Sequence, residues 1–258
     1  MTPTPDDRLT DSLDQHGFGA RLEWGQAGVR RLAPLVDVVV IVDVLSFTTA
    51  VSVAVEHGAA VFPHRFRDAT AAERARSVGA RLAQARQDGP GPSLSPASLT
   101  ALMPGDRLLL PSPNGATCAV LAAEAGATVV AGCMRNASAV ARLVRERGRT
   151  VAVIPAGEQW PDGTLRPGIE DLLGAGAILA ALAAEGGDRW GSGAASPEAR
   201  LAVAAFERLR PDLARVLEAC ASGRELIDRG FSRDVDLAAD LDATDLVPVL
   251  RDGAFAAA

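Results

Sequence analysis

The stretch VDVVVIVDVLSFTT, residues 36–49, contains an unbroken Val/Ile run over residues 38–42 that leads directly into Asp43. Such an apolar run is typical of a strand that is covered on both faces. Open α/β sheets place their binding sites outside the carboxyl ends of these strands. The stretch therefore predicts a buried strand that carries Asp43 at the end where sites form.

The hydroxyl residues that follow Asp43 predict an anion site. Ser46, Thr48 and Thr49 can cap the next helix, whose free amide groups and positive dipole end attract phosphate. Asp43 would repel this anion unless a cation lay between them, and a divalent metal that bridges carboxylate and phosphate removes the conflict. The alternative is that Asp43 only caps the helix.

Strand and helix patterns alternate along the chain and predict a three-layer α/β/α fold with a central mixed or mostly parallel sheet. We expect a flexible segment over residues 1–19 and a single domain over residues 20–258. Further strands are expected at residues 61–63, 108–110, 128–131, 151–154 and 247–250. Helices are expected at residues 49–56, 69–78 and 170–184, with a mainly helical region at residues 197–229. Residues 89–104 and 156–168 are predicted loops, and residues 186–196 a linker.

Composition excludes several classes of protein. The chain has 258 residues and a net charge of −6, which argues against general nucleic-acid binding. No apolar window is long enough to span a membrane, and the N-terminus lacks the apolar core of a signal peptide. Three cysteines at unpatterned spacings favour reduced thiols in a cytoplasmic protein. The apolar helices after Pro197 suggest a homodimer contact.

Missing residue types exclude further chemistries. The chain contains no lysine, so a Walker A loop and an internal lysine Schiff base are ruled out. The GxSxG, CxxC and HExxH motifs are also absent, which leaves hydrolase-elbow, thioredoxin and zincin interpretations without support.

Two later turns also carry polar residues after a predicted strand. Asn114 and Gly115 can offer an amide side chain and a close backbone approach to a ligand, although an ordinary Asn-Gly turn would look the same. Arg135 and Asn136 form the next turn. Because an arginine at a helix start opposes the helix dipole, Arg135 needs an anion, either a ligand or a neighbouring carboxylate.

The second strongest signal is a pair of acids, Glu170 and Asp171, at the start of a helix that is apolar nearly all round. Carboxylates suit Mg²⁺, and Asp43 together with one or two of Glu158, Glu170 and Asp171 would form a sparse Mg²⁺ site. Glu170 and Asp171 join Asp43 as candidate catalytic residues, although both could simply be helix-start acids. Candidate arginines for a small, multiply charged substrate are Arg135, Arg166 and Arg224.

The segment ACASGRELIDRG, residues 219–230, supplies three more candidate substrate-binding residues. Ser222, Gly223 and Arg224 offer hydroxyl, amide and guanidinium groups to an anion. Arg224 follows Cys220 by only four positions, so the CX5R spacing of a cysteine phosphatase loop is absent. We therefore predict that Cys220 is a buried thiol and not a nucleophile.

Taken together, these motifs resemble the 2-phosphosulfolactate phosphatase family. The matching stretches are VIVDVLSFTTAVSVAVEHGA, SPASL, PSPNGATCA, GCMRNASAVA, GIEDLLGAGAI and ACASGRELIDRGFSRDVDLAADLD. The resemblance covers most of residues 20–253 and implies an α/β/α fold. It also implies an Mg²⁺-dependent acid phosphatase that hydrolyses (2R)-2-phospho-3-sulfolactate to 3-sulfolactate and inorganic phosphate in a coenzyme M pathway.

The chain departs from the family pattern at three positions. Ser46 stands where an arginine is usual, Leu94 precedes the SP of SPASL, and Pro113 replaces a common hydroxyl residue. These departures suggest another small phosphoacid as substrate, a relocated arginine or a weakly active member. The competing hypothesis is a non-catalytic protein that binds an anionic metabolite at the same turns. For the enzyme, we favour attack by a metal-bound water over a phosphorylated Asp43, because Leu45 stands where a haloacid-type phosphatase has a second aspartate.

Overall fold

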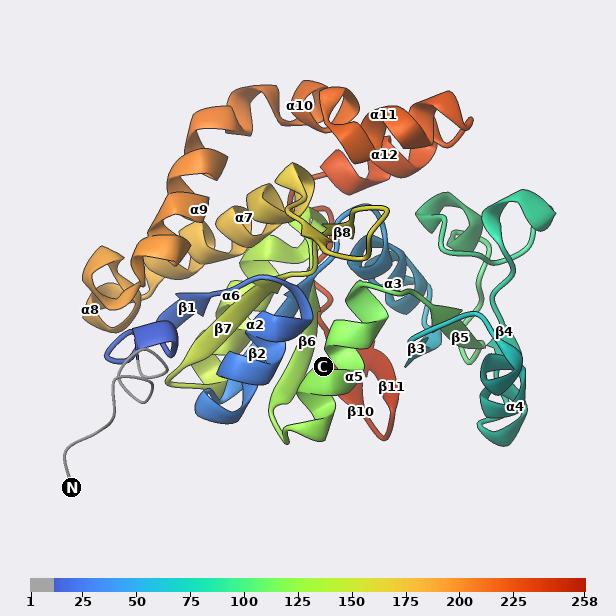
Figure 1. Ribbon diagram of the computed structural model, residues 1–258, viewed down its shortest axis with the longest axis horizontal. Coiled ribbons are helices and arrows are strands. Elements are labelled where there is room, and N and C mark those ends of the chain that lie inside the picture. The colour runs from blue at the N-terminus through green and yellow to red at the C-terminus, as the bar shows by residue number, and fades with distance from the viewer. Residues whose placement is uncertain (1–11) are drawn as a thin grey trace.

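The computed structural model describes residues 12–258, and these residues contain a nine-stranded mixed sheet (Figure 1). Its strands follow the order β1-β7-β2-β6-β10-β11-β3-β5-β4, and all neighbours are parallel except those of β10 and β11. The strands are β1 (Ala20–Leu22), β2 (Val38–Val42), β3 (Ala60–His64), β4 (Arg81–Leu82), β5 (Arg107–Pro111), β6 (Thr128–Gly132), β7 (Val151–Pro155), β10 (Pro248–Arg251) and β11 (Ala254–Ala257). This sheet confirms the predicted α/β class.

Helices cover both faces of the sheet and complete three layers. One side carries α2 (Gly25–Leu32), α3 (Phe47–Glu56) and α5 (Gly115–Glu124), and α4 (Ala69–Ser77) packs beside β4 and β5. The other side carries α6 (Ala137–Arg147) and α7 (Ile169–Glu185), with α9 (Pro197–Leu209) packed on α7. The remaining α-helices of the described residues are α8 (Gly187–Trp190), α10 (Leu213–Ala219), α11 (Ala221–Asp228) and α12 (Ser232–Ala239).

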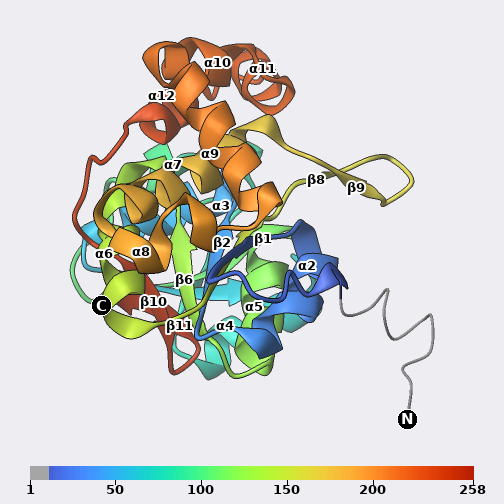
Figure 2. The ribbon, with the colours of Figure 1, turned by 90° about the vertical axis from the view of Figure 1, so that its left-hand side faces the viewer.

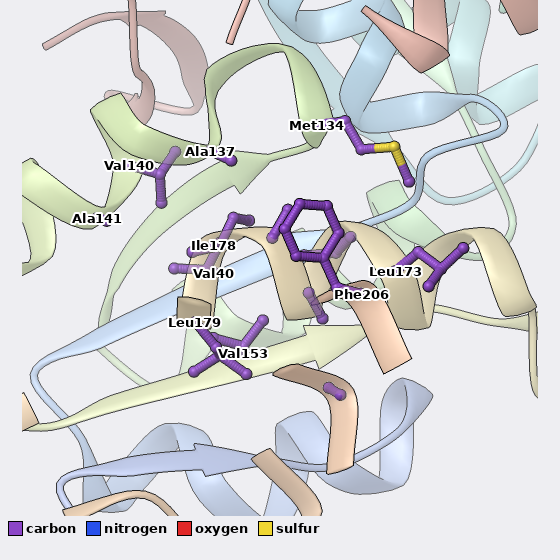
Figure 3. Packing of buried hydrophobic residues seen from close by; sticks show 14 of the residues in the cluster. Val40, Met134, Ala137, Val140, Ala141, Val153, Leu173, Ile178, Leu179 and Phe206 are labelled. Atoms are coloured by element: carbon purple, nitrogen blue, oxygen red, sulfur yellow. The ribbon is translucent and has the colours of Figure 1, made fainter. Parts of the chain in front are cut away.

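The alternation of side chains along β2 builds the two cores. Val40 belongs to the cluster that packs under α6 and α7 with Val153, Ile178 and Phe206 (Figure 3). Ile41 points to the opposite face and belongs to the cluster under α2, α3 and α5. Both residues are fully buried, as expected for a strand that is covered on both faces.

The structure adds elements that the sequence patterns did not predict. The expected loop over residues 156–168 contains a small hairpin of β8 (Glu158–Gln159) and β9 (Leu165–Arg166), which projects from the body (Figure 2). The expected linker over residues 186–196 contains α8, and the last predicted strand is paired with β11. Within residues 12–258, no helix is long and apolar enough to cross a membrane.

The first part of the expected N-terminal segment, residues 1–11, lies outside the described residues. Its second part is attached to β1. The Gln15 side chain donates to the Leu22 carbonyl at 2.7 Å and accepts from the Leu22 amide at 3.1 Å. Arg21 donates in return to the carbonyls of Asp14 and Phe18.

Candidate active site

The turn after β2 places Asp43 between two helix starts. Asp43 is 7% exposed, and its Oδ1 accepts from the Phe47 amide at 3.0 Å, so it does cap α3. Its Oδ2 accepts from the Gly115 amide at 2.9 Å, which joins the turn after β5 to the turn after β2. A Cβ at Gly115 would collide with the Asp43 carboxylate, so this contact needs glycine.

The two threonines of this turn hold its backbone. Thr48 Oγ1 accepts from the Asp43 amide at 3.0 Å and donates to the Asp43 carbonyl at 2.9 Å. Thr49 Oγ1 donates to the Val44 carbonyl at 2.8 Å. Both hydroxyls are fully buried, and each of these bonds is made within the turn. The threonines therefore position Asp43 rather than face the pocket beside it.

A pocket of about 190 Å³ opens beside Asp43. It brings together five residues that the sequence analysis predicted from four separate segments. They are Asp43, Ser46, Asn114, Glu158 and Ser222. We call this hollow the active-site pocket.

The neighbouring acids occupy different environments. Asp171 Oδ1 accepts from the Val44 amide at 2.7 Å, and its Oδ2 accepts from the Gly157 amide at 2.9 Å. Asp171 thus ties the turn after β2 to the loop after β7. Glu158 lies at the pocket, where its Oε2 accepts from Asn114 Nδ2 at 3.0 Å. Glu170 is 2% exposed at the start of α7.

Burial and the charge of neighbouring carboxylates raise the pKa of Asp43, Asp171 and Glu158. Burial is the main cause of the raised pKa of Asp43, two backbone hydrogen bonds oppose it, and the charge of Glu170 adds to it. Burial, with the charges of Asp43 and Glu170, raises the pKa of Asp171 well above its ordinary value. The same three causes raise the pKa of Glu158 to about 7.

The donor chemistry of this acidic cluster fits a hard cation. No group of three or more His, Cys, Asp or Glu residues is arranged as a preformed metal site within residues 12–258. Mg²⁺ usually takes only one or two carboxylates, together with waters and substrate phosphate oxygens. A cation would also relieve the repulsion that raises these pKa values. Asp43 and Glu158, which both line the active-site pocket, match the one or two carboxylates of a sparse Mg²⁺ site, whereas Glu170 is not among the lining residues.

Arg86 is the site residue that sequence reasoning missed. Its Nη2 donates to Ser46 Oγ at 2.5 Å and to the Leu94 carbonyl at 3.1 Å, and its side chain is 13% exposed. Its Nε faces Asp234 Oδ2 at 3.7 Å, and its guanidinium lies 5.5 Å from the centre of the Phe231 ring. Burial lowers the pKa of Arg86, while Asp234 is the main opposing charge.

The feature of the sequence that could have led to Arg86 was the serine at position 46, where the family pattern has an arginine. Ser46, Leu94 and Pro113, the three departures from the family pattern, all line the active-site pocket. Arg86 contacts two of them. A relocated arginine was one of the predicted explanations, and the structure places this guanidinium at the serine that stands in the usual arginine position.

The other predicted arginines lie in different surroundings. Arg166 donates to Ser222 Oγ at 3.0 Å, at the rim of the active-site pocket. Arg135 pairs with Glu56 Oε2 at 2.8 Å and with Asp240 Oδ2 at 3.3 Å, so neighbouring carboxylates supply the anion it needs.

Three other predicted substrate-binding residues do not line the active-site pocket. Asn136 accepts from the Cys133 amide at 2.9 Å and donates to the Ala131 carbonyl, and so supports its own turn. Gly223 packs so closely on the Leu217 carbonyl that a Cβ would overlap it. Arg224 is exposed.

Comparison with known proteins identifies the family. Residues 29–253 match the family described as 2-phosphosulpholactate phosphatase. The chain belongs to this family. A protein of Deinococcus radiodurans named "Probable 2-phosphosulfolactate phosphatase" is 33% identical over 84% of this chain and 89% of its own length. Proteins with the same name from Microcystis aeruginosa and Thermus thermophilus are 26% and 30% identical, over 84% and 83% of this chain and over 90% and 88% of their own lengths.

Family membership makes the chain a relative of phosphoric monoester hydrolases. The matched range contains all the residues of the active-site pocket. It also contains Asp171, Thr48 and Gly115, which position the Asp43 turn.

Proposed function

We propose that this protein is an Mg²⁺-dependent phosphatase that hydrolyses 2-phospho-3-sulfolactate, or a closely similar small phosphoacid, to the hydroxy acid and inorganic phosphate. The observation that carries the proposal is the meeting of Asp43, Asn114, Glu158 and Arg86 around one small pocket. These residues combine oxygen ligands for a cation with donors for an anion, as phosphoryl transfer requires.

Asp43 and Glu158 would hold the Mg²⁺ ion in the pocket, and Glu170 at the start of α7 is the further predicted ligand. When bound, the ion would draw negative charge from the phosphoryl oxygens and so stabilise the transition state. The chain itself must keep these acids in place before the ion and the substrate bind. The amides of Phe47 and Gly115 do this for Asp43.

Two side chains would bind the phosphate and neutralise the rest of its charge. Arg86 brings a guanidinium to the pocket, and Asn114 brings a side-chain amide. The Phe231 ring and Asp234 orient the guanidinium. Donors that are oriented before the reaction stabilise developing charge without reorganisation.

The surroundings of Asp43 favour attack by water over attack by this carboxylate. Both carboxylate oxygens already accept a backbone hydrogen bond, at 3.0 and 2.9 Å. These bonds stabilise negative charge on the carboxylate and make it a weaker nucleophile. Appearance of ¹⁸O from labelled water in the Asp43 carboxylate, rather than only in phosphate, would contradict this preference.

The first test measures phosphate release from racemic 2-phospho-3-sulfolactate with Mg²⁺ or with EDTA. The unaltered protein is compared with Asp43→Asn and with Asp236→Asn, a control at an exposed aspartate. We expect Mg²⁺-dependent release that falls by about 10³-fold or more in Asp43→Asn and stays within about twofold in the control.

Other results would change the proposal in defined ways. Release from a different phosphoacid alone would keep the mechanism and discard the substrate. Binding of the ester without release of phosphate from any ester would instead support the metabolite-binding hypothesis.

A further inference from the structure

A second hollow of opposite charge adjoins the active-site pocket. It has a volume of about 300 Å³ and lies where β3, β4 and β5 end. Its lining includes Arg65, Arg67, Arg86 and Arg229 and, among the described residues, no carboxylate. The chain has a net charge of −6, but the four guanidinium groups around this hollow make its lining positive. We call this hollow the arginine pocket.

The two pockets share a wall. Arg86, Leu94 and Pro113 line both of them. On the active-site side, the charged lining residues besides Arg86 are Asp43, Glu158 and Glu225, all of them acids. A ligand that lies across this wall therefore meets acidic groups at one end and guanidinium groups at the other.

The positive charge of the arginine pocket is partly balanced by neighbouring carboxylates, and among its described lining residues Arg67 is the arginine whose charge is free for a ligand. Arg65 pairs with Glu124 at 2.8 Å, and Arg229 pairs with Glu225 at 2.9 Å. Arg67 is exposed and has no ion-pair partner among residues 12–258. The only carboxylate paired with Arg86 in this part of the chain is Asp234, at 3.7 Å and without a hydrogen bond to Nε.

We propose that the arginine pocket is a second anion subsite, which binds the non-reacting strong-acid group of the substrate while the phosphate lies in the active-site pocket. The inference rests on the proposed function. Binding of this second acid group would give the phosphatase its specificity for the substrate. A sulfonate or carboxylate presents oxygens that a planar guanidinium can bind in bidentate fashion. Arg86, which reaches both pockets, is the arginine that even a short substrate would contact.

The test compares the kcat/KM values of two esters of similar size, measured with the Arg67→Gln variant. 2-Phospho-3-sulfolactate carries additional acid groups, whereas glycerol 2-phosphate carries none. We expect the ratio of kcat/KM for the first ester to that for the second to fall about tenfold, through KM, because one charged contact is lost. Arg251→Gln, at another exposed arginine, is the matched control and should leave the ratio within about twofold.

A binding measurement separates failure of this inference from failure of the proposed function. Calorimetric titration with 3-sulfolactate, which has no phosphate, reports on the subsite without turnover. We expect Arg67→Gln to weaken this binding about tenfold and Arg251→Gln to leave it as it is. Equal losses of kcat/KM for both esters, or unweakened 3-sulfolactate binding, would overturn the subsite. Absence of turnover with any ester, combined with the expected loss of binding, would overturn only the phosphatase.

Discussion

At the scale of single residues, the side chains of this site form hydrogen bonds with backbone groups more often than they face the pocket. Asp43 accepts amides from two helix starts, and Asp171 accepts one amide from the Asp43 turn and one from the loop after β7. Thr48 and Thr49 form hydrogen bonds that hold the backbone of the turn containing Asp43. Because the turn is held from several directions, the carboxylate of Asp43 has little freedom to move when ligands bind or leave.

Cys220 allows a prediction at the residue scale. Its thiol donates to the Leu217 carbonyl at 3.1 Å, and burial with the nearby Glu170 charge raises its pKa to about 11. Because this thiol is protonated at neutral pH, it cannot serve as a nucleophile. We expect Cys220→Ser to keep kcat within about threefold in the phosphate-release assay. Loss of turnover in a variant that unfolds normally in urea would contradict this assignment.

At the scale of elements, side-chain hydrogen bonds join the ends of neighbouring strands, in addition to the backbone hydrogen bonds of the sheet. Asp37, just before β2, accepts from the Arg149 amide at 2.7 Å and the Thr150 amide at 3.0 Å, just before β7. These bonds link the amino ends of two neighbouring parallel strands. The opposite ends of the same strands lead to Asp43 and Glu158.

Asp37 makes this link dependent on pH. Hydrogen bonds from Arg149 and Thr150 lower its pKa below the ordinary value of 3.8, although burial opposes them. A lowered folded-state pKa adds stability above the unfolded-state value, and that stability is lost as pH falls through the folded-state value. Since Asp37 is exposed, we expect Asp37→Asn to lower the free energy of unfolding by only about 0.5–1 kcal/mol at pH 7.

The measurement is urea unfolding of the unaltered protein, Asp37→Asn and the exposed control Asp236→Asn from pH 7 down to pH 3. The cost of Asp37→Asn should shrink below about pH 4, because protonated Asp37 loses its advantage over asparagine. A cost that grows as the pH falls would show that the sign is wrong. The control should stay within about 0.5 kcal/mol of the unaltered protein at pH 7.

At the scale of the whole molecule, the C-terminal hairpin joins two groups of parallel strands. β10 pairs with β6, and β11 pairs with β3, so the last strands of the chain lie in the middle of the sheet. Phe255 on β11 is fully buried, with its ring 6.2 Å from that of Phe47, edge to face. The hairpin therefore supports the helix whose first amide holds Asp43.

Phe255→Ala tests the role of this hairpin. Removing a buried ring from the centre of the sheet should lower the free energy of unfolding by about 3–5 kcal/mol. Phe66→Ala is the control, because Phe66 is 55% exposed and its removal should cost about 0.5 kcal/mol or less. Urea unfolding measures both, and equal effects would show that the hairpin contributes little to stability.

The predicted homodimer contact after Pro197 stays a prediction.

Short-range patterns determined most of the elements and several site residues. The Val/Ile run over residues 38–42 predicted a strand covered on both faces, and β2 occupies these residues with every side chain buried. Asp43 and Asn114 were identified because polar residues that follow buried strands meet at one edge of a sheet. These inferences depend on local preferences, which the sequence carries within a few residues.

Only the tertiary structure decided which candidates meet. Arg86 lies 40 positions from Ser46, and no local pattern indicates that its guanidinium reaches the serine. The carboxylates that pair with Arg135 likewise come from other elements. Side chains that are distant in the chain come together through strand order and packing, and here the insertion of the C-terminal hairpin into the sheet sets that order. The sequence by itself determined most of the strands and the chemistry of the turns, whereas folding determined which of those turns face one pocket.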